Sequence, residues 1–324
     1  AFKLLPEEEE TRLELERLVE ITTEWSFLAG IYAAVLIEHP DLANRRDVLA
    51  RLAELEDEKL DDPRAALSSY RELVRLDTSD LGAVVAIERL ATLLADWRSL
   101  EEALVAHSDM VFDDEERRDV LIRLGSLRHL TLDDSVGAIE AYERAWEVDS
   151  TRVDVCDWLI SLYESGDDAG RLVELYLARV DLTEDDDARY EFLIRAAALF
   201  EKKLSDRPRA LAPLRRTIAA RHGDAAAIAE LNRLYREEEM WSELLDNLRL
   251  DASTAETEER RLEVRHEMAS ILSEKLESYE ESLEAYGIIL NEKPDDVRAP
   301  AAVFALAERE EPLRQQAAEL LVPA

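Results

Sequence analysis

The chain is poor in the residues that interrupt or cross-link a fold. Its 324 residues include 8 glycines, 9 prolines and one cysteine, Cys156. A single cysteine excludes an intrachain disulfide, and its place among apolar core positions predicts a buried structural thiol. With so few helix breakers and abundant Ala, Leu, Glu and Arg, the composition favours helix almost throughout.

Positive charge is also scarce. Forty Lys and Arg stand against 75 Asp and Glu, which gives a net charge of −35. A nucleic-acid partner is therefore disfavoured, because binding a polyanion needs Lys and Arg to neutralise its phosphates. The acidity fits a solvated surface, a basic partner or a saline habitat.

Motifs that carry chemistry are missing as well. No histidine lies at metal-ligand spacing from another histidine or from the cysteine. There is no glycine-rich phosphate loop and no G-x-S-x-G motif. The acidic runs lack the ligand pattern of a calcium loop, and three of them suit predicted helix starts: Glu7–Glu10, Asp113–Glu116 and Glu184–Asp187. We expect neither an enzyme nor a bound cofactor or metal.

A fixed period of 72 residues runs through the sequence from end to end. It holds identical or similar residues in columns, among them Leu28, Leu100, Leu172 and Leu244, and also Tyr70, Tyr142, Leu214 and Tyr286. Self-similarity at a fixed step is the signature of a repeat array, in which each unit packs on its neighbours. We therefore expect one continuous array over residues 1–324. We also expect that it begins inside a repeat and belongs to a longer protein.

Each period contains four amphipathic helical stripes. Residues 44–60 form the first, Asp62 is a natural N-cap for the second and Pro63 suits its first turn. A third stripe covers residues 83–95, and Trp97 opens the fourth. Apolar spacing of this kind is typical of helices that bury one face.

This pattern resembles the tetratricopeptide repeat (TPR) family of helix–turn–helix units. The resemblance rests on a small first-helix column, on second-helix alanines followed four residues later by Tyr70, Tyr142 and Leu214, and on a proline eight residues after Tyr286. The small residues are Ala53, Gly125, Ala197 and Ala269, the second-helix alanines are Ala66, Ala138 and Ala210, and the proline is Pro294. It implies an all-α solenoid of about nine helical hairpins, or 18 helices, in a right-handed superhelix. It also implies a concave groove that binds proteins or peptides.

One acidic column lies on first helices, which line the groove in this family: Asp47, Asp119, Glu191 and Glu263. Arginines four residues later predict helix-stabilising pairs for the first three. Glu267 replaces the arginine in the fourth case, so Glu263 and Glu267 are expected to be the least neutralised part of the column.

The helix over residues 25–37 departs from its counterparts because it carries no charge. Phe27, Gly30, Val35 and Ile37 replace mainly charged or polar residues, and we place them on a face opposite the core. Thirteen helical residues span about 20 Å, too short to cross a membrane core of ~30 Å. An apolar outer face indicates protein binding or self-association; the alternative is that a preceding segment of the chain covers it.

The second departure is the basic stretch of residues 202–222. It contains seven Lys and Arg around an unusual helical proline, Pro213, which should kink the helix: Lys202, Lys203, Arg207, Arg209, Arg215, Arg216 and Arg221. The stretch either receives an acidic segment or pairs with acids of the same chain.

These features predict a non-catalytic protein-interaction scaffold that binds a protein or peptide partner. The alternative is a regulatory or targeting region of a larger enzyme or signalling protein. No signal peptide or membrane-spanning segment is visible in the sequence, and we expect a cytoplasmic location.

Overall fold

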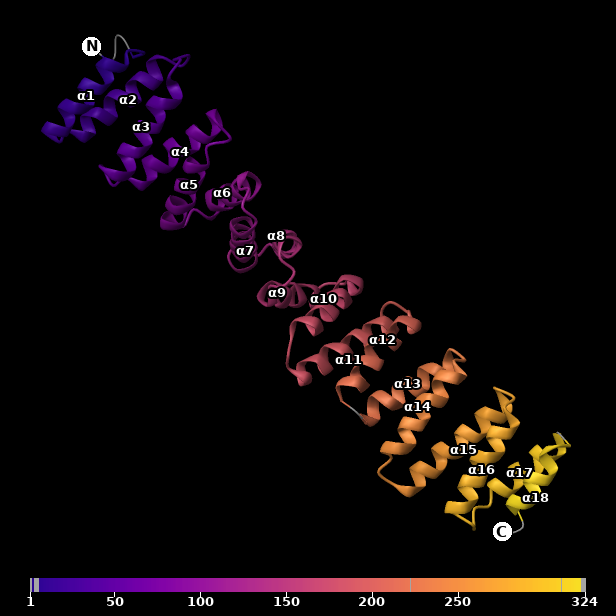
Figure 1. Ribbon diagram of the computed structural model, residues 1–324. Coiled ribbons are helices and arrows are strands. Elements are labelled where there is room, and N and C mark those ends of the chain that lie inside the picture. Colours follow the sequence, from indigo (N-terminus) through magenta and orange to yellow (C-terminus); the bar gives the residue numbers. More distant parts are fainter. Residues whose placement is uncertain (1, 3–5, 222, 310, 322–324) are drawn as a thin grey trace. The chain divides into compact units, whose positions relative to one another are not determined.

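The structure is a computed structural model that describes residues 2, 6–221, 223–309 and 311–321 (Figure 1). Regular secondary structure in these residues is entirely α-helical. The helices are α1 (Glu9–Thr22), α2 (Trp25–Glu38), α3 (Arg45–Glu58), α4 (Pro63–Leu76), α5 (Leu81–Leu94), α6 (Trp97–Met110), α7 (Asp114–Leu130), α8 (Ser135–Val148), α9 (Val153–Glu164), α10 (Ala169–Leu182), α11 (Asp186–Lys202), α12 (Arg207–Ala220), α13 (Ala225–Glu237), α14 (Trp241–Thr254), α15 (Glu258–Glu274), α16 (Tyr279–Glu292), α17 (Ala299–Arg309) and α18 (Leu313–Leu321).

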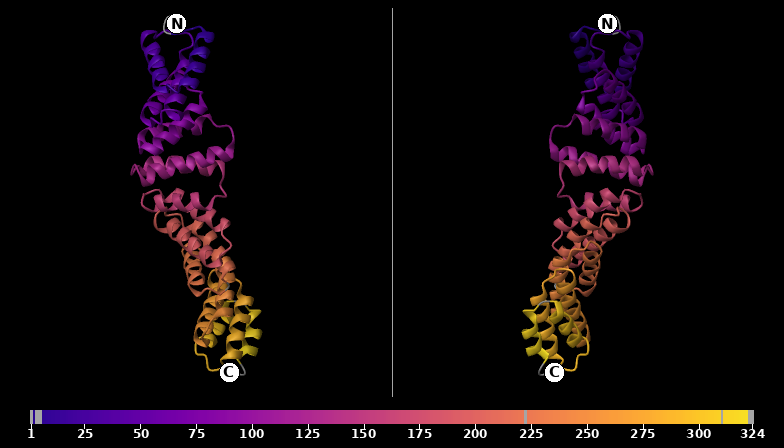
Figure 2. Two further views of the ribbon diagram at one scale, coloured as in Figure 1. Left: turned by 90° about the vertical axis from the view of Figure 1, so that its left-hand side faces the viewer. Right: turned by 90° about the vertical axis from the view of Figure 1, so that its right-hand side faces the viewer.

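The chain divides into two compact units, residues 1–162 and 163–324, with the boundary inside α9. Within each unit a helix packs mainly on its neighbours in the sequence, as Figures 1 and 2 show. Each hairpin buries its apolar stripe against the next one, so no central core is needed. This confirms the all-α solenoid architecture and the 18 helices. The superhelical path and the continuity over residues 1–324 stay predictions.

The 72-residue step is visible in how the helices begin. The carboxylates of Asp62, Asp134 and Asp206 each accept a hydrogen bond from the N–H three residues later, at 3.1, 2.9 and 3.1 Å. A side chain at the N-cap thereby satisfies one of the unpaired N–H groups of the first turn. The predicted N-cap at Asp62 and the predicted N1 proline at Pro63 are confirmed.

The residue before each of these three caps has a left-handed backbone, and so does the residue at the same position one period later. The column consists of Asp61 (φ 52°), Asp133 (φ 56°), Ser205 (φ 53°) and Glu277 (φ 53°). Alternate turns use Thr23, Ala95 and Glu239 in the same way. Side chains with a Cβ are strained in this region, so the turns that join the two helices of a hairpin carry a small, repeated conformational cost.

The small first-helix column faces the second-helix aromatic. At Gly125 an added Cβ would lie 2.6 Å from the ring of Tyr142. That ring is buried and stacks on Trp158, with 5.1 Å between centroids. Because two helices approach this closely, only a small residue fits between them. Cys156 is fully buried in the same unit, as predicted.

Pro213 does not end its helix. α12 runs through it, the proline is buried, and its carbonyl accepts a hydrogen bond from the Thr217 hydroxyl at 3.0 Å. The tertiary neighbours therefore tolerate a residue that removes one helical hydrogen bond.

Candidate functional site

A groove opens between α1 and α2 in the first unit. Its volume is about 990 Å³, and its apolar lining includes Phe2, Leu15, Leu18, Phe27 and Ile31, with Gly30 beside them. Glu10 and Glu14 lie at its edge. The Phe27 side chain is 62% exposed and that of Leu18 is 47% exposed, so large apolar side chains face open space there.

Phe2, which lines the groove, packs against a second aromatic ring. Phe2 is buried and meets Tyr32 edge to face, with 5.7 Å between ring centroids. Burial raises the pKa of Tyr32, so its phenol stays protonated and donates to the Glu16 carboxylate at 2.5 Å. Phe2 and Tyr32 thus belong to the packed core, whereas Phe27 and Leu18 stay exposed.

Gly30 adds free space to the groove. No atom lies within 4 Å of a Cβ built at this position. The corresponding residues in later periods are Glu102, Glu174 and Asp246. A partner atom can thus approach the α2 backbone more closely here than on the equivalent helices.

The structure joins Phe27 and Gly30 in one surface but corrects the placement of Val35. Val35 is fully buried in the core of the first unit, so the prediction that it belongs to an exposed outer face was wrong. Ile37 is 80% exposed, yet it does not line the groove. Of the four predicted residues, two build the groove.

The prediction for Val35 fails because a charged or polar residue at the corresponding position of a later period need not be exposed. His107 and Asp251 stand in the same column and are both buried. His107 Nδ1 lies 2.5 Å from the Glu88 carboxylate, and Asp251 accepts from the Asn232 side chain at 3.0 Å. The partner residues Glu88 and Asn232 are also 144 residues apart. The same two positions therefore form a buried polar pair again two periods later. Buried charges need such partners.

The basic stretch is largely paired inside its own unit. Its ion pairs are Lys203–Asp167 at 3.8 Å, Arg207–Glu237 at 3.3 Å, Arg209–Asp206 at 3.9 Å, Arg216–Asp181 at 2.6 Å and Arg221–Asp187. Arg215 donates to the Tyr235 hydroxyl at 2.7 Å. Lys202 has no ion pair among the described residues, and His222 lies outside them. Pairing with acids of the same chain, the second of the two predicted alternatives, accounts for five of these seven cations.

The acidic column is exposed at Asp47, Asp119, Glu191 and Glu263. The predicted pairs with the arginines four residues later are wrong. Those arginines contact other acids, at 3.0, 2.8 and 3.1 Å: Arg51–Glu54, Arg123–Glu88 and Arg195–Glu164. Arg side chains are long enough to reach a neighbouring helix, so sequence spacing alone does not select their partner.

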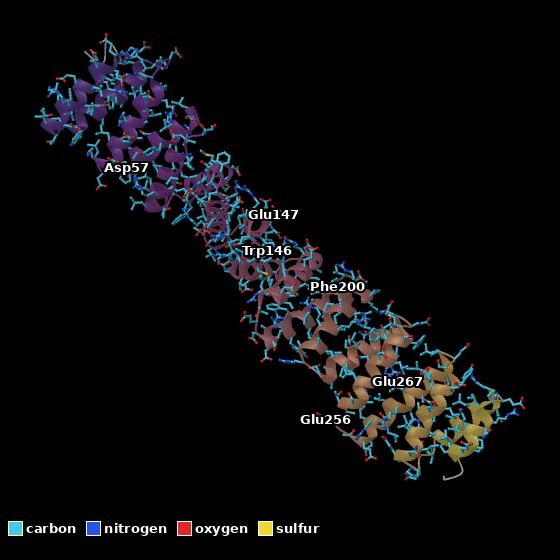
Figure 3. The ribbon with its side chains drawn as sticks, viewed as in Figure 1. Asp57, Trp146, Glu147, Phe200, Glu256 and Glu267 are labelled. Carbon is cyan, nitrogen blue, oxygen red and sulfur yellow. The ribbon has the colours of Figure 1, made fainter. Side chains whose placement is uncertain are left out.

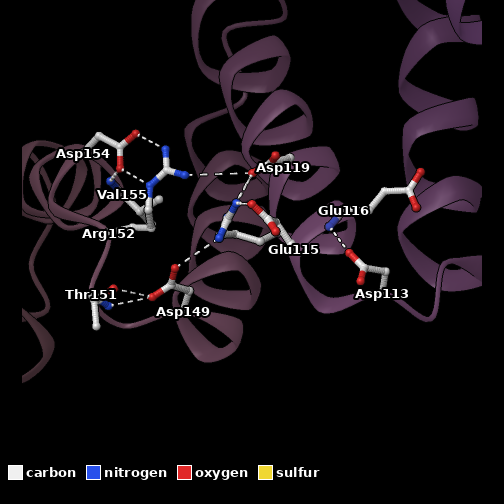
Figure 4. A network of polar contacts seen from close by, with 10 residues as sticks. Asp113, Glu115, Glu116, Asp119, Asp149, Thr151, Arg152, Asp154 and Val155 are labelled. Atoms are coloured by element: carbon white, nitrogen blue, oxygen red, sulfur yellow. Dashed lines mark hydrogen bonds and ion pairs between the residues drawn. The ribbon is translucent and has the colours of Figure 1, made fainter.

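Asp119 belongs to a wider network, shown in Figure 4. Arg118 contacts its carboxylate at 2.8 Å and that of Asp149 at 3.2 Å. The Thr151 hydroxyl and N–H also donate to Asp149, and these bonds lower the pKa of that carboxyl. Figure 4 further shows the Asp113 carboxylate accepting from the Glu116 N–H, which confirms the predicted acidic start of α7.

Glu267, labelled in Figure 3, is not an unneutralised acid. It accepts two hydrogen bonds from Arg236, at 2.7 and 3.0 Å. The prediction that it is among the least neutralised residues was therefore wrong, because the balancing charge comes from α13 and not from α15. Glu263 has no ion pair within the described residues.

Two further observations bear on chemistry. No group of three or more His, Cys, Asp or Glu residues in the described part of the chain could hold a metal ion. None of the helices in that part is both long and apolar enough to span a membrane.

Comparison with known proteins adds only distant likenesses. No protein-family model matches the chain, and no curated protein matches it. Among solved structures it is similar to Naa15/Naa10 bound to HypK-THB, at 15% identity and a TM-score of 0.39, covering 82% of this chain and 39% of that one. It is also similar to the P58(IPK) TPR domain, at 14% identity and 0.28, covering 96% and 98%. A third is a tetratricopeptide repeat protein from Parabacteroides merdae, at 13% identity and 0.32, covering 79% and 96%.

The fold assignment rests on the helices of this chain. Their short turns, their left-handed turn residues and their side-chain caps recur at 72 residues. The described residues therefore have a tetratricopeptide-like repeat fold.

Proposed function

We propose that this chain is a non-catalytic protein-interaction scaffold that binds a partner protein in the groove between α1 and α2. The observation that carries the proposal is the open apolar groove, in which Phe27 is 62% exposed. A concave, exposed apolar patch in an otherwise strongly charged chain is typical of a protein interface. Repeat arrays supply such surfaces without any catalytic constellation.

The charged surfaces support this choice by contrast. The arginines of the basic stretch contact acids or aromatic groups of their own unit. Glu267 and Asp119 also have arginine partners. Charges that are already paired have less to gain from a partner than unpaired ones. In the groove, in contrast, Phe27 and Leu18 stay exposed among the described residues.

The test uses one substitution inside the groove and a matched one outside it. Phe27→Glu introduces the residue that stands at position 243, one of its counterparts. Phe112→Glu is the control: Phe112 is 94% exposed, and its counterparts at 184 and 256 are glutamates. Circular dichroism establishes that both variants stay helical.

A photo-crosslinking residue at position 30 then reports what occupies the groove in cells that express the protein. We expect a crosslinked protein whose yield falls by about tenfold, or about 1.4 kcal/mol, with Phe27→Glu and does not fall with Phe112→Glu. Equal crosslinking of both variants would reject the groove as the binding site. Gel filtration of the purified protein shows whether the crosslinked species is a second copy of this chain.

A further inference from the structure

Position 214 interrupts a column of aromatic residues. Tyr70, Tyr142 and Tyr286 stand at the corresponding positions of the other three periods. Tyr142 is 1% exposed and Tyr286 is 7% exposed, so both rings belong to the core. Leu214 is buried as well, but its side chain is smaller and carries no ring. The third period therefore lacks an aromatic ring where the other periods have one.

A pocket of about 300 Å³ lies at this position, among α11, α12 and α13 (Figure 1). The buried part of its lining is apolar: Ala197, Ala210, Leu214, Ala227 and Leu234. Ala226 and Lys202 also line it and are exposed, so the pocket is open to solvent on their side. Ligand pockets span roughly 300–1,000 Å³. This pocket is at the small end of that range and fits one side chain better than a large cofactor.

The ring of Tyr142 shows what fills this place one period earlier. It lies beside Gly125, where an added Cβ would be 2.6 Å from it, and it stacks on Trp158 with 5.1 Å between centroids. The counterparts of these two residues, 72 positions later, are Ala197 and Glu230, and both line the pocket. The ring and the pocket thus occupy equivalent positions in successive periods.

The ring of Tyr286 gives the same result one period later. Its centroid lies 6.0 Å from that of the His266 ring, and position 266 corresponds to Ile194, which also lines the pocket. Ala269, the counterpart of Ala197, belongs to the same core cluster as Tyr286. An alanine at this position therefore leaves room for a ring.

The acids at the pocket are balanced within the chain. Arg233 donates to the Glu201 carboxylate at 2.6 Å and to the Glu230 carboxylate at 2.5 Å, and both acids line the pocket. Hydrogen bonds from Arg233 lower the pKa of Glu230, which keeps this carboxylate ionised and paired. Lys202, the third charged residue of the lining, is exposed and can stay hydrated. The apolar interior favours a neutral occupant, because burying a further charge there would cost its hydration.

We propose that this pocket binds the side chain of a tyrosine or phenylalanine presented by a partner protein. The ring takes the place that Tyr70, Tyr142 and Tyr286 take in their own periods. An apolar pocket with a polar rim is typical of sites that receive an aromatic anchor of a protein interface. The pocket lies in the second compact unit and the groove between α1 and α2 in the first. The inference therefore concerns a second binding site and does not depend on that groove.

Two blocked tripeptides that differ only in the central side chain test the inference: acetyl-Gly-Tyr-Gly-amide and acetyl-Gly-Leu-Gly-amide. Each is added to the full chain, in which the alanine methyl groups are isotope-labelled for NMR. The ring current of an aromatic occupant shifts the methyl signals of the alanines that line the pocket: Ala197, Ala198, Ala210, Ala226 and Ala227. We expect the tyrosine peptide to shift these signals and to bind about tenfold more tightly than the leucine peptide.

Two substitutions close the pocket and a third leaves it open. Leu214→Tyr restores the ring of the other periods, and Ala226→Arg introduces the residue that stands at position 298. Each should weaken binding of the tyrosine peptide by about tenfold. Ala229→Arg is the control, because Ala229 is exposed on the same helix α13 and does not line the pocket; it should leave binding unchanged.

Thermal unfolding establishes that the variants are folded. Leu214→Tyr should not lower the melting temperature, because the ring enters space that is already present. Ala226→Arg changes an exposed residue, so it still tests the site if Leu214→Tyr unfolds.

The outcomes that overturn the inference are distinct. If the leucine peptide binds as tightly as the tyrosine peptide, the pocket does not select a ring. If p-cresol, the tyrosine side chain as a free molecule, shifts the pocket methyl signals and the tyrosine peptide does not, the site takes small aromatic molecules and the protein partner is overturned. If the tyrosine peptide causes no shift, or binds equally to Leu214→Tyr and Ala226→Arg, the site itself is overturned. Crosslinking from position 30 tests the groove between α1 and α2 separately, so the two proposals fail independently.

Discussion

Glu267 and Arg236 form a two-bond ion pair, and one period earlier the same two positions carry the opposite charges. Glu267 accepts from Arg236 at 2.7 and 3.0 Å, whereas Arg195 donates to Glu164 at 3.1 Å. Positions 195 and 267 correspond, as do 164 and 236. At both of these contacts, between α13 and α15 and between α9 and α11, the charges are opposite, and either orientation occurs.

Exchanging the charges at Arg236 and Glu267 should therefore be tolerated, although each single change is not. Glu267→Arg places two cations together and should lower the free energy of unfolding by about 0.5–1 kcal/mol, since both side chains are partly exposed. Adding Arg236→Glu recreates the arrangement of positions 164 and 195 and should restore most of the loss. Urea unfolding of the single and double variants measures this coupling. A double variant no more stable than the worse single one would contradict it.

The contribution of Asp149 to stability should disappear in acid. Hydrogen bonds from Thr151, and then from Arg118, lower the pKa of this carboxyl in the folded chain. A lowered folded pKa gives stability that is present above the unfolded value of about 4 and is lost as the pH falls through the folded value.

The stability difference between the natural chain and Asp149→Asn should thus be largest near pH 6 and shrink toward pH 3. Glu147→Gln is the control, because Glu147 lies two residues earlier in α8 (Figure 3), is exposed and has no ion pair among the described residues. Thermal unfolding across this pH range measures both. A difference for Asp149→Asn that does not change with pH would argue against the hydrogen-bonded carboxylate.

Glycine should stabilise the left-handed turn at Ala95. Its φ of 54° strains a residue that has a Cβ, so Ala95→Gly should raise the free energy of unfolding by about 1 kcal/mol. The same change inside a helix has the opposite sign. Ala106→Gly, within α6, should cost about 1 kcal/mol. Chemical denaturation compares the two variants, and a loss of stability in both would show that the turn is not strained.

Two helical glycines should respond differently to alanine. Gly30 has open space around it, so Gly30→Ala should stabilise α2 by about 0.5–1 kcal/mol. At Gly125 the new Cβ would lie 2.6 Å from the Tyr142 ring. Overpacking there should outweigh the helix gain and give a net loss of about 1 kcal/mol. Melting temperatures that rise for both variants would contradict the close approach of α7 and α8.

Local features of this fold could be predicted because they depend on few residues. Asp62 followed by Pro63 favours a helix start independently of tertiary contacts, because the cap and the fixed φ of proline act within one turn. The resemblance to the TPR pattern predicts the small Gly125 opposite Tyr142, and the two positions lie in close contact. Helix boundaries, caps and the hairpin architecture belong to this class.

The functional surface depended more on tertiary structure. Phe27 and Gly30 could be singled out by their uncharged side chains, but Val35 could not be separated from them. Helical periodicity gives the angle between residues on one helix, not the sector that a neighbouring helix covers. That sector is decided by packing, which buries Val35 and, one period later, buries His107 against Glu88.

By itself, the sequence determined an all-α repeat with its register, its caps and its shortage of catalytic motifs, because these follow from local conformational preferences and a fixed period. Only the tertiary structure decided which charges meet and which apolar residues stay uncovered. Arg51, Arg123 and Arg195 each had an acid four residues before them, yet each contacts a different one. A long side chain can reach several acids. Arg51 contacts Glu54 on its own helix, whereas helix packing brings Glu88 to Arg123 and Glu164 to Arg195.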